Sequence, residues 1–164
     1  MQVRDGVRHS EVDSSNVCEL GLLSLIYISR SALAVHGDAD AVNEIIRLSE
    51  IRNGSLRVTG RLIYTELHFA QLLEGPACAI AELMRSIRRD ERHRDVSIVA
   101  EQRIAARKWK DWAMSYSGAS PYLDRHLKPL ISPATAEEER PPLVERLMSV
   151  MQKLDAEPMY TTSR

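Results

Sequence analysis

Residues 68–75, HFAQLLEG, decide the fold, because they predict a central strand with the amide of Gln71 in its middle. The stretch before it, VTGRLIY at residues 58–64, predicts a second strand. The short segment between them predicts the turn of a hairpin, although it contains neither glycine nor proline. On the buried face of such a strand, an unpaired amide costs about 1–3 kcal/mol. Gln71 therefore predicts a polar partner, for which a bound ligand is one candidate.

Further elements are predicted on both sides of this hairpin. In order, they are a strand at 22–28, a helix at 42–52, strands at 57–64 and 68–74, a helix that starts at Pro76, and strands at 96–105 and 112–117. Asn53 and Gly54 are expected to end the first helix, since both residues tolerate the left-handed conformation of a helix terminus. The order βαββαββ predicts an α+β, ferredoxin-like mixed sheet with two helices on one face.

The length of 164 residues and a hydrophobic content of 44% predict a single core. We expect a mobile N-terminal extension at 1–20, the sensor domain at 21–118, a C-terminal helical extension at 119–156 and a tail at 157–164. Pro141 and Pro142 predict the start of a helix in this extension. Its apolar stripe, which consists of Leu143, Leu147, Val150, Met151 and Leu154, is expected to cover the bare face of the sheet or to contact a partner.

Composition excludes several classes of protein. A formal net charge of −1 predicts no general attraction to nucleic acid or to a membrane surface. The apolar runs are shorter than the roughly 20 residues that a membrane-spanning helix needs. Cys18 and Cys78 lie far apart and no secretory signal precedes them, which predicts a cytoplasmic protein without a disulfide framework. The histidines and cysteines show no spacing typical of a metal site.

The alternation of side chains along strands brings chemically active groups to one face. Residues of equal parity share a face, so Tyr27 lies with Leu25 and Ser29, Gln71 with Phe69 and Leu73, and Met114 with Trp112 and Tyr116. Three neighbouring strands are then expected to direct a phenol, an amide and a thioether or indole to one spot. Taken singly, Tyr27 and Met114 are typical of a core, and Gln71 fits an exposed face as well as a buried one. Their combination favours a site for a planar, redox-active heterocycle.

Tyr27 in LIYISR, Asn53 in IRNGSLRVTG, Gln71 in HFAQLLEG and the run DWAMSYSG, which contains Trp112 and Met114, occur in the order typical of one family. From about residue 22 to residue 117 the chain resembles the BLUF family, the sensors of blue light that use flavin. The resemblance implies a blue-light photoreceptor without enzymatic activity of its own. It also implies a flavin bound non-covalently, FAD in the first place and FMN as the alternative.

The resemblance also implies a role for each matching residue. Tyr27 matches the tyrosine that gives an electron and a proton to the excited flavin, and Gln71 matches the glutamine between the tyrosine and the flavin, whose hydrogen bonds then rearrange by rotation or tautomerisation. Trp112 and Met114 match the pair on the last strand whose exchange of position is thought to carry the signal outward. The implied cofactor-binding residues are Tyr27, Ser29, Ser49, Arg52, Asn53, Gln71, Asp90, Arg92, His93 and Met114.

The output of the sensor is less defined by the sequence. Only about 47 residues follow Ser117, which is too few for an effector domain of ordinary size. The chain therefore resembles the short, stand-alone members of the family, which act on a separate partner protein and often form homo-oligomers. Residues 124–154 are the candidate contact surface, and the compatible alternative is that they cover the sheet.

Two other classes share this topology. A ferredoxin-like nucleic-acid binder needs a platform of aromatic side chains and a basic face, but this chain contains one phenylalanine and no such arrangement. A hydrolase of small acids with this topology needs a glycine-rich loop beside an arginine to hold phosphate, and GSLRVTG contains too few glycines. A small-molecule binding module without flavin is the other alternative. A flavin absorption spectrum separates both classes from a photosensor.

Overall fold

The computed structural model describes residues 21–33 and 39–156. The predicted N-terminal extension and the predicted tail lie outside these residues. The elements are β1 (Leu22–Ser31), α1 (Ala39–Ser55), β2 (Thr59–Tyr64), β3 (His68–Pro76), α2 (Ala77–Arg89), β4 (His93–Ile104), β5 (Trp112–Ser117), α3 (Pro121–Ile131), a short 3-10 turn η2 (Glu137–Glu139) and α4 (Arg140–Ala156). The predicted order βαββαββ is confirmed.

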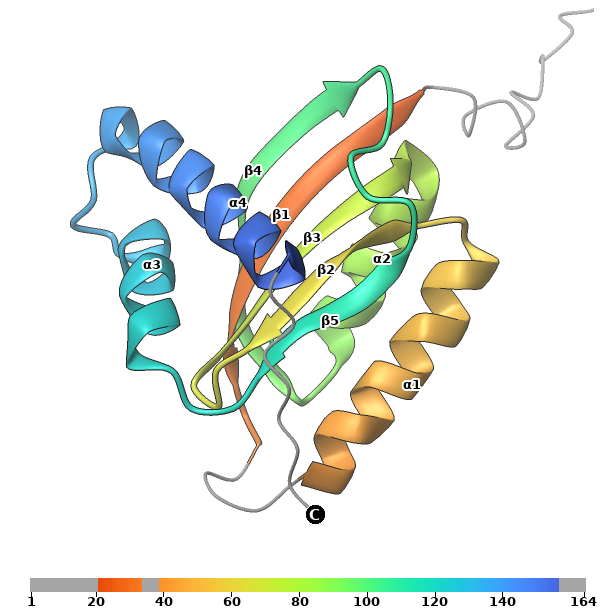
Figure 1. The fold of residues 1–164 in the computed structure, drawn as a ribbon, viewed down its shortest axis with the longest axis horizontal. Coiled ribbons are helices and arrows are strands. Elements are labelled where there is room, and N and C mark those ends of the chain that lie inside the picture. The colour runs from red at the N-terminus through yellow and green to blue at the C-terminus, as the bar shows by residue number, and fades with distance from the viewer. Residues whose placement is uncertain (1–20, 34–38, 157–164) are drawn as a thin grey trace, which may run out of the picture.

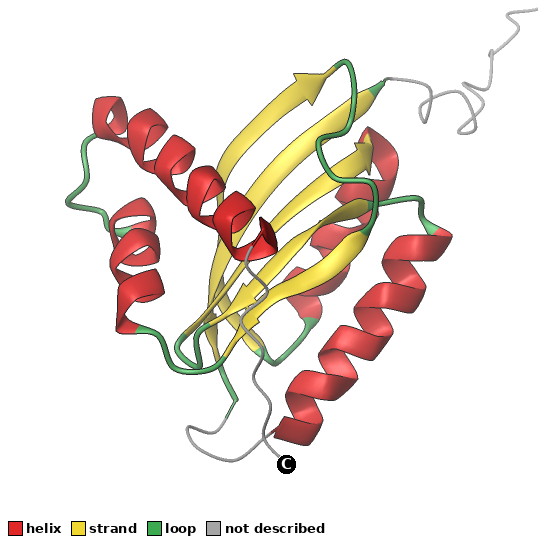
Figure 2. Cartoon of the chain, viewed as in Figure 1, coloured by secondary structure: helices red, strands yellow, loops and turns green. Residues whose placement is uncertain are grey.

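The five strands form one mixed sheet in the order β4-β1-β3-β2-β5. Strands β1 and β3 pair antiparallel, as do β1 and β4, and β2 and β3, whereas β2 and β5 run parallel. Strand β3 lies at the centre, and it is buried along almost its whole length, as the sequence HFAQLLEG predicts. Figure 2 shows the sheet between two layers of helices. The predicted α+β class with a mixed sheet is therefore confirmed.

Helices α1 and α2 cover one face of the sheet (Figure 1). Helix α2 contributes Ile80, Leu83 and Met84 to a cluster that includes Leu25 and Tyr27 of β1. Helix α1 contributes Val42 and Ile45 to a neighbouring cluster with side chains of β2 and β3. The two helices rest on adjacent parts of the sheet, and residues of both helices and of the sheet line one cavity.

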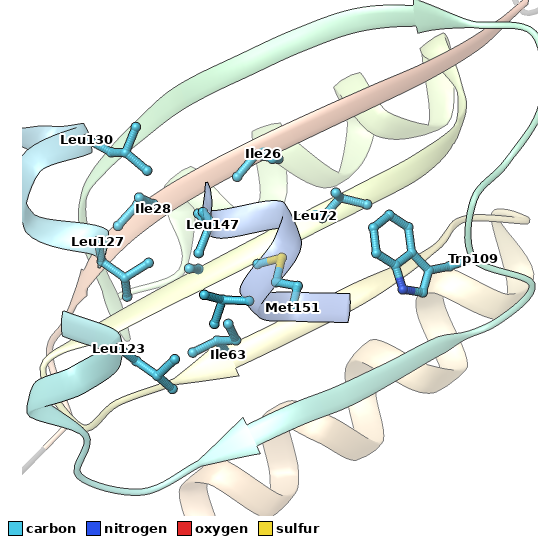
Figure 3. Packing of buried hydrophobic residues seen from close by; sticks show 12 residues of the cluster. Ile26, Ile28, Ile63, Leu72, Trp109, Leu123, Leu127, Leu130, Leu147 and Met151 are labelled. Atoms are coloured by element: carbon cyan, nitrogen blue, oxygen red, sulfur yellow. The ribbon is translucent and has the colours of Figure 1, made fainter. Parts of the chain in front are cut away.

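Helices α3 and α4 cover the opposite face. Leu147 and Met151 of α4 and Leu127 of α3 pack on Ile26 and Leu72 of the sheet (Figure 3). All of these side chains are almost completely buried. Part of the predicted stripe of α4 thus covers the sheet, which was one of the two alternatives for this segment, and the helix begins one residue before the predicted prolines.

The end of α1 differs from the prediction. The helix continues through Asn53 and Gly54 to Ser55, and Arg57 takes the left-handed conformation, with φ of 53°. The amide of Val58 donates to the carbonyl of Asn53 at 2.8 Å, and the amide of Arg57 donates to the carbonyl of Gly54 at 3.1 Å. This pattern is a Schellman motif, which normally has glycine at the position that Arg57 occupies. Burial of Val58 against the core fixes the terminus.

A bulge in β5 overturns a second expectation. Met114 is the register partner of Leu62 and Tyr116 is the partner of Ile63, so Ser115 has no partner in β2. The extra residue reverses the side-chain alternation, and Tyr116 packs with the α3 and α4 side of the core instead of sharing a face with Met114. The strands that carry Tyr27, Gln71 and Met114 are also not three neighbours, because β2 lies between β3 and β5.

In residues 21–33 and 39–156, no helix is long and apolar enough to span a membrane, and no three histidine, cysteine, aspartate or glutamate side chains gather as a metal site would require. Cys78 in the first turn of α2 is disulfide-bonded, whereas the sequence predicted a protein without a disulfide framework. The other cysteine, Cys18, lies outside the described residues.

Candidate functional site

A cavity of about 300 Å³ lies between α1, α2 and the sheet. Its volume is at the lower end of the range for small-molecule pockets in proteins. The lining residues come from six segments of the chain and are Tyr27, Ile45, Leu48, Ser49, Ile51, Arg52, Asn53, Leu62, Gln71, Leu83, Ser86, Ile87, Asp90, Arg92 and His93. The helices supply mostly apolar walls and the sheet supplies polar groups at the base, which suits a flat ligand with a polar edge.

A phenol and an amide meet at the base of the cavity. Tyr27 and Gln71 are direct register partners across β1 and β3, and the Tyr27 hydroxyl donates to Oε1 of Gln71 at 2.8 Å. Both side chains are nearly inaccessible to solvent. Burial, with a smaller contribution from the charge of Asp90, raises the pKa of Tyr27 above its ordinary value. The phenol is therefore neutral at physiological pH and holds its proton on the bond to Gln71.

Two amide groups face the cavity without a protein partner. In the described part of the chain, neither the Gln71 NH2 group nor the Asn53 side chain hydrogen-bonds to another protein group. Both residues are less than 5% exposed, and both line the cavity. Buried amides of this kind are costly unless a ligand supplies donors and acceptors. A flavin ring edge, which alternates carbonyl oxygens and ring nitrogens, fits this requirement.

An ion pair borders the cavity between α2 and β4. Arg92 Nε donates to Asp90 Oδ1 at 2.9 Å, and its Nη2 donates to Oδ2 at 2.6 Å. Partial burial alone would raise the pKa of the Asp90 carboxyl, but hydrogen bonds and charge from Arg92 outweigh it and lower this pKa. Asp90 in turn raises the pKa of Arg92. The pair stays ionised, and the short α2–β4 connection is fixed beside the cavity.

His93 forms a neutral wall of the same cavity. Its Nδ1 lies 2.8 Å from Oγ of Ser29, and its ring packs on Phe69 with the ring centroids 4.4 Å apart. Burial is the main cause that lowers the pKa of His93 to about 4. The negative charge of Asp90 opposes this shift only in part, and the positive charge of Arg92 adds to it. His93 is the first residue of β4, which begins three residues before the predicted start of this strand at residue 96.

The mouth of the cavity lies along α1. Leu48 is 41% exposed and Ile51 is 61% exposed, although both line the cavity. Arg52 hydrogen-bonds to Oγ of Ser86 and lies 3.8 Å from Glu82, so it bridges α1 and α2 at this opening. An apolar rim with one cation is typical of a slot that holds a ring inside and leaves a polar tail near solvent.

The structure brings most of the predicted cofactor-binding residues to one place. Eight of the ten line the cavity, namely Tyr27, Ser49, Arg52, Asn53, Gln71, Asp90, Arg92 and His93. Ser29 lies behind His93, and Met114 lies beyond Leu62, which separates it from Gln71. Trp112 is on the same side of the sheet as Met114. The Trp112 indole nitrogen is buried and has no hydrogen-bond partner among the described residues.

Sequence reasoning missed Ser86 and the apolar walls as parts of the site. For this segment the sequence predicted only a helix that starts at Pro76, without a role in the site, yet Leu83 and Ile87 line the cavity. Leu83, Ser86, Ile87 and Asp90 follow one another at spacings of three, one and three, which places them on one helical face. Ser86, a polar residue between Leu83 and Ile87 on this face, is the feature of the sequence that indicates a cavity rather than a continuous core.

The sequence was compared with families and curated proteins. The profile of the family described as BLUF, sensors of blue-light using FAD, matches residues 22–115, more than half of the chain. The photoactivated adenylate cyclase subunit alpha of Euglena gracilis is 41% identical over 78 residues, which cover 48% of this chain and 8% of that protein. The blue light- and temperature-regulated antirepressor BluF of Escherichia coli (strain K12) is 35% identical over 75 residues, or 46% of this chain and 18% of that protein. This chain thus spans less than a fifth of the length of these relatives.

Solved structures agree with the sequence comparison. The dark-state structure of BlrB, described as a BLUF protein, is 32% identical with a TM-score of 0.61, and the match covers 79% of this chain and 96% of that one. Klebsiella pneumoniae BlrP1, solved with FMN and cyclic diGMP, is 26% identical with a TM-score of 0.54, over 84% of this chain and 36% of that one. The photo-activated state of BlsA, at 18% identity and a TM-score of 0.61 over 77% of this chain and 94% of that one, supports the fold. The resemblance seen in the sequence is confirmed, and the chain belongs to the BLUF family, the sensors of blue light using FAD.

Proposed function

We propose that this chain is a blue-light photoreceptor that binds one flavin non-covalently in the cavity between α1, α2 and the sheet. The observation that supports this most strongly is the buried Tyr27–Gln71 hydrogen bond beside the unpartnered amide of Asn53. FAD is the first candidate, since the family is described by it. FMN is the alternative, because BlrP1 was solved with FMN.

Several residues would hold the ring. Asn53 and Gln71 would hydrogen-bond to its polar edge, and Ile45, Leu83 and Ile87 would form the walls. Arg52 and Ser49 would lie toward the tail at the mouth, and Asp90, Arg92 and His93 would border the ring on the side of β4. Desolvation of the ring by the apolar walls would strengthen each of these hydrogen bonds.

When bound, a flavin supplies absorption of blue light and an excited state that accepts an electron. Tyr27 is the donor that we propose, because its phenol lines the cavity and is neutral. A phenol that has lost an electron is a much stronger acid than a phenol, so Tyr27 would release its proton along the 2.8 Å hydrogen bond to Gln71. Gln71 both accepts and donates, which suits it to relay that proton.

The switch itself would be the arrangement of hydrogen bonds around Gln71. Its amide would rotate or change tautomer while Tyr27 returns to its original state, so that the donor and the acceptor exchange places. A difference of a few kcal/mol between two arrangements is sufficient to shift a second equilibrium in the protein. Leu62 and Met114 follow Gln71 in the same row across the sheet. Trp112 lies two residues before Met114 in β5 and on the same side of the sheet. Met114 and Trp112 are therefore the proposed outward relay.

For the output, we propose a separate effector protein and self-association rather than catalysis by this chain. The described residues form the sheet and the helices that cover it. The relatives carry their sensor in much longer proteins, such as the adenylate cyclase subunits. The outer surfaces of α3 and α4 are the proposed contact surface. We also propose a cytoplasmic location, as the sequence predicts; recovery of the protein outside the cytoplasmic fraction after cell fractionation would refute it.

The test of the sensor function is spectroscopic. Purified protein should be yellow with a flavin spectrum, and blue light should cause a small red shift that reverses in the dark. Extraction and chromatography of the cofactor distinguish FAD from FMN. A colourless protein that cannot be reconstituted with either flavin would refute the proposal.

A further inference from the structure

Asp155, in the last turn of α4, accepts three hydrogen bonds from three other segments. Its Oδ2 accepts from Nε of Arg61 in β2 at 2.7 Å and from the indole nitrogen of Trp109 in the β4–β5 connection at 2.9 Å. Its Oδ1 accepts from Oγ of Ser115 in β5 at 3.0 Å. One carboxylate therefore ties the C-terminal end of α4 to two strands and a loop.

The link to β5 is separate from the other two. Ser115 donates to Oδ1 of Asp155, whereas Arg61 and Trp109 both donate to Oδ2. The hydrogen bond of Ser115 can therefore break while the other two remain. Ser115 is also the bulged residue of β5, without a partner in β2. A bulged residue on an edge strand is held weakly by the sheet, so the contact with Asp155 contributes to its position.

Ser115 also connects the two faces of the sheet. The residue before it, Met114, lies on the cavity side, where its partner Leu62 is in turn the partner of Gln71. Ser115 contacts Asp155 on the side covered by α4. Since the two are joined by one peptide bond, a displacement of Met114 moves Ser115.

We propose that the Ser115–Asp155 hydrogen bond is a latch that transmits the state of the cavity to α4. This inference rests on the proposed photosensor function. In the dark the latch is closed, and the last turns of α4 stay on the sheet, where Met151 of α4 packs in the same core cluster as Trp109. In the lit state the displaced β5 breaks the bond to Oδ1, and the end of α4 loosens while Arg61 and Trp109 keep it in place.

The Arg61–Asp155 pair explains why the helix stays attached. The Arg61 side chain is 12% exposed and that of Asp155 is 26% exposed, so the pair is shielded from solvent more than an ordinary surface ion pair. Arg61 also lies 3.0 Å from Asp111, which would leave it paired if Asp155 were neutralised. The latch therefore changes the dynamics of α4 without removing the helix from the core.

The experiment compares amide hydrogen exchange in α4 between dark and illuminated full-length protein loaded with flavin. The variants are Ser115→Ala and Asp155→Asn. Two controls match them. Ser149→Ala removes a serine hydroxyl of α4 that bonds to the carbonyl of Glu145 in its own helix, and Asp111→Asn removes a different carboxylate from Arg61 without touching α4.

In wild type, illumination should speed exchange in the last two turns of α4 by roughly 2–10-fold, which is the effect of losing one hydrogen bond. Ser115→Ala should show this faster exchange already in the dark, keep the flavin red shift and lose most of the light-dependent difference. Asp155→Asn removes the ion pair with Arg61 and leaves a single acceptor oxygen for three donors, so it should speed exchange in the dark at least as much as Ser115→Ala does. Both controls should follow wild type.

Two results would overturn the latch. One is a normal red shift in wild type with no light-dependent change in α4, and the other is a light-dependent change in Ser115→Ala equal to that of wild type. Absence of any red shift in flavin-loaded wild type would instead refute the photosensor function, and the latch with it. The spectrum therefore separates failure of the proposed function from failure of the latch alone.

Discussion

Tyr27 and Gln71 are opposed residues of β1 and β3, and the hydroxyl of the first donates to the amide oxygen of the second at 2.8 Å. This bond fixes the orientation of the amide, because the oxygen is used by Tyr27 and the NH2 group is left for the cavity. Asn53, from the last turn of α1, lines the same cavity. The pair thus presents a hydrogen-bond donor to the cavity.

Tyr27→Phe should keep flavin binding and abolish the light-induced red shift. Phenylalanine fills the same space but supplies no proton, and its ring is much harder to oxidise. Loss of the hydrogen bond should lower the free energy of unfolding by about 1 kcal/mol. Absorption spectra before and after blue light, with a urea titration in the dark, measure both effects. A normal photocycle in this variant would remove Tyr27 from the proposed role.

Gln71→Leu should bind flavin and fail to form the shifted state. Leucine occupies a similar volume in the buried strand, but it offers neither an acceptor to Tyr27 nor a donor to the cavity. The matched control is Gln102→Leu, which replaces an exposed glutamine at the edge of the sheet and should leave the spectrum unchanged. A wild-type shift in Gln71→Leu would exclude the amide relay.

Asn53→Ala should weaken flavin binding by about tenfold, which corresponds to the loss of one hydrogen bond in a site shielded from water. The red shift of the remaining bound flavin should persist, since Tyr27 and Gln71 are intact. Asn43→Ala, at an exposed position of the same helix, is the control and should bind as wild type does. Flavin titration followed by fluorescence measures the affinity, and equal affinities would place the ring elsewhere.

His93 should make the protein less stable in mild acid. Its pKa in the folded state is lowered to about 4 from 6.5. Between these values the unfolded chain takes up a proton that the folded chain does not, so stability falls as pH drops from 6.5 toward 4. The loss attributable to His93 should approach about 3 kcal/mol at the lower end, at 1.36 kcal/mol for each pKa unit. The Asp90 carboxyl, whose pKa is also lowered, affects stability only below its ordinary range near 3.8.

Urea titrations at pH 7 and pH 4.5 test this for wild type and His93→Gln. The variant should lose most of the pH dependence in this window. His126→Gln is the control. Burial lowers the pKa of His126 too, but this histidine is only partly buried, so the variant should keep most of the pH dependence of wild type. An unchanged pH dependence in His93→Gln would show that another group titrates.

Strand and helix order followed from the sequence because apolar periodicity and Pro76 are local signals. Parity along each strand predicted that Tyr27 and Gln71 share a face, but only the register makes them direct partners. The bulge at Ser115 has no local signal, since neither glycine nor proline marks it. The sequence therefore placed Tyr116 on the wrong side of the sheet.

The end of α1 shows a different limit. The rule that glycine takes the left-handed position predicted a helix end at Gly54, yet Arg57 takes that position. Burial of Val58 overrides the local preference, and it keeps Asn53 within the helix, where its side chain lines the cavity. Tertiary packing, which a local pattern does not contain, decided both this terminus and the bulge.

Met114→Ala should leave the red shift largely intact and reduce the light-dependent change in exchange across residues 143–154. Met114 donates neither an electron nor a proton, so the photochemistry at Tyr27 and Gln71 should proceed. It is separated from Gln71 by Leu62 alone in the row across the sheet, so truncation of its side chain should weaken the coupling of the cavity to β5.

Met114→Leu is the matched control, since leucine keeps the volume and apolar character of methionine and such exchanges usually cost less than about 1.5 kcal/mol. It should transmit the change that the alanine variant loses. If both variants and wild type show an equal light-dependent change, Met114 is not on the route. If the alanine variant also loses the red shift, Met114 is required for the photochemistry in the cavity. Its role would then not be the proposed one of carrying the signal from Gln71 to β5.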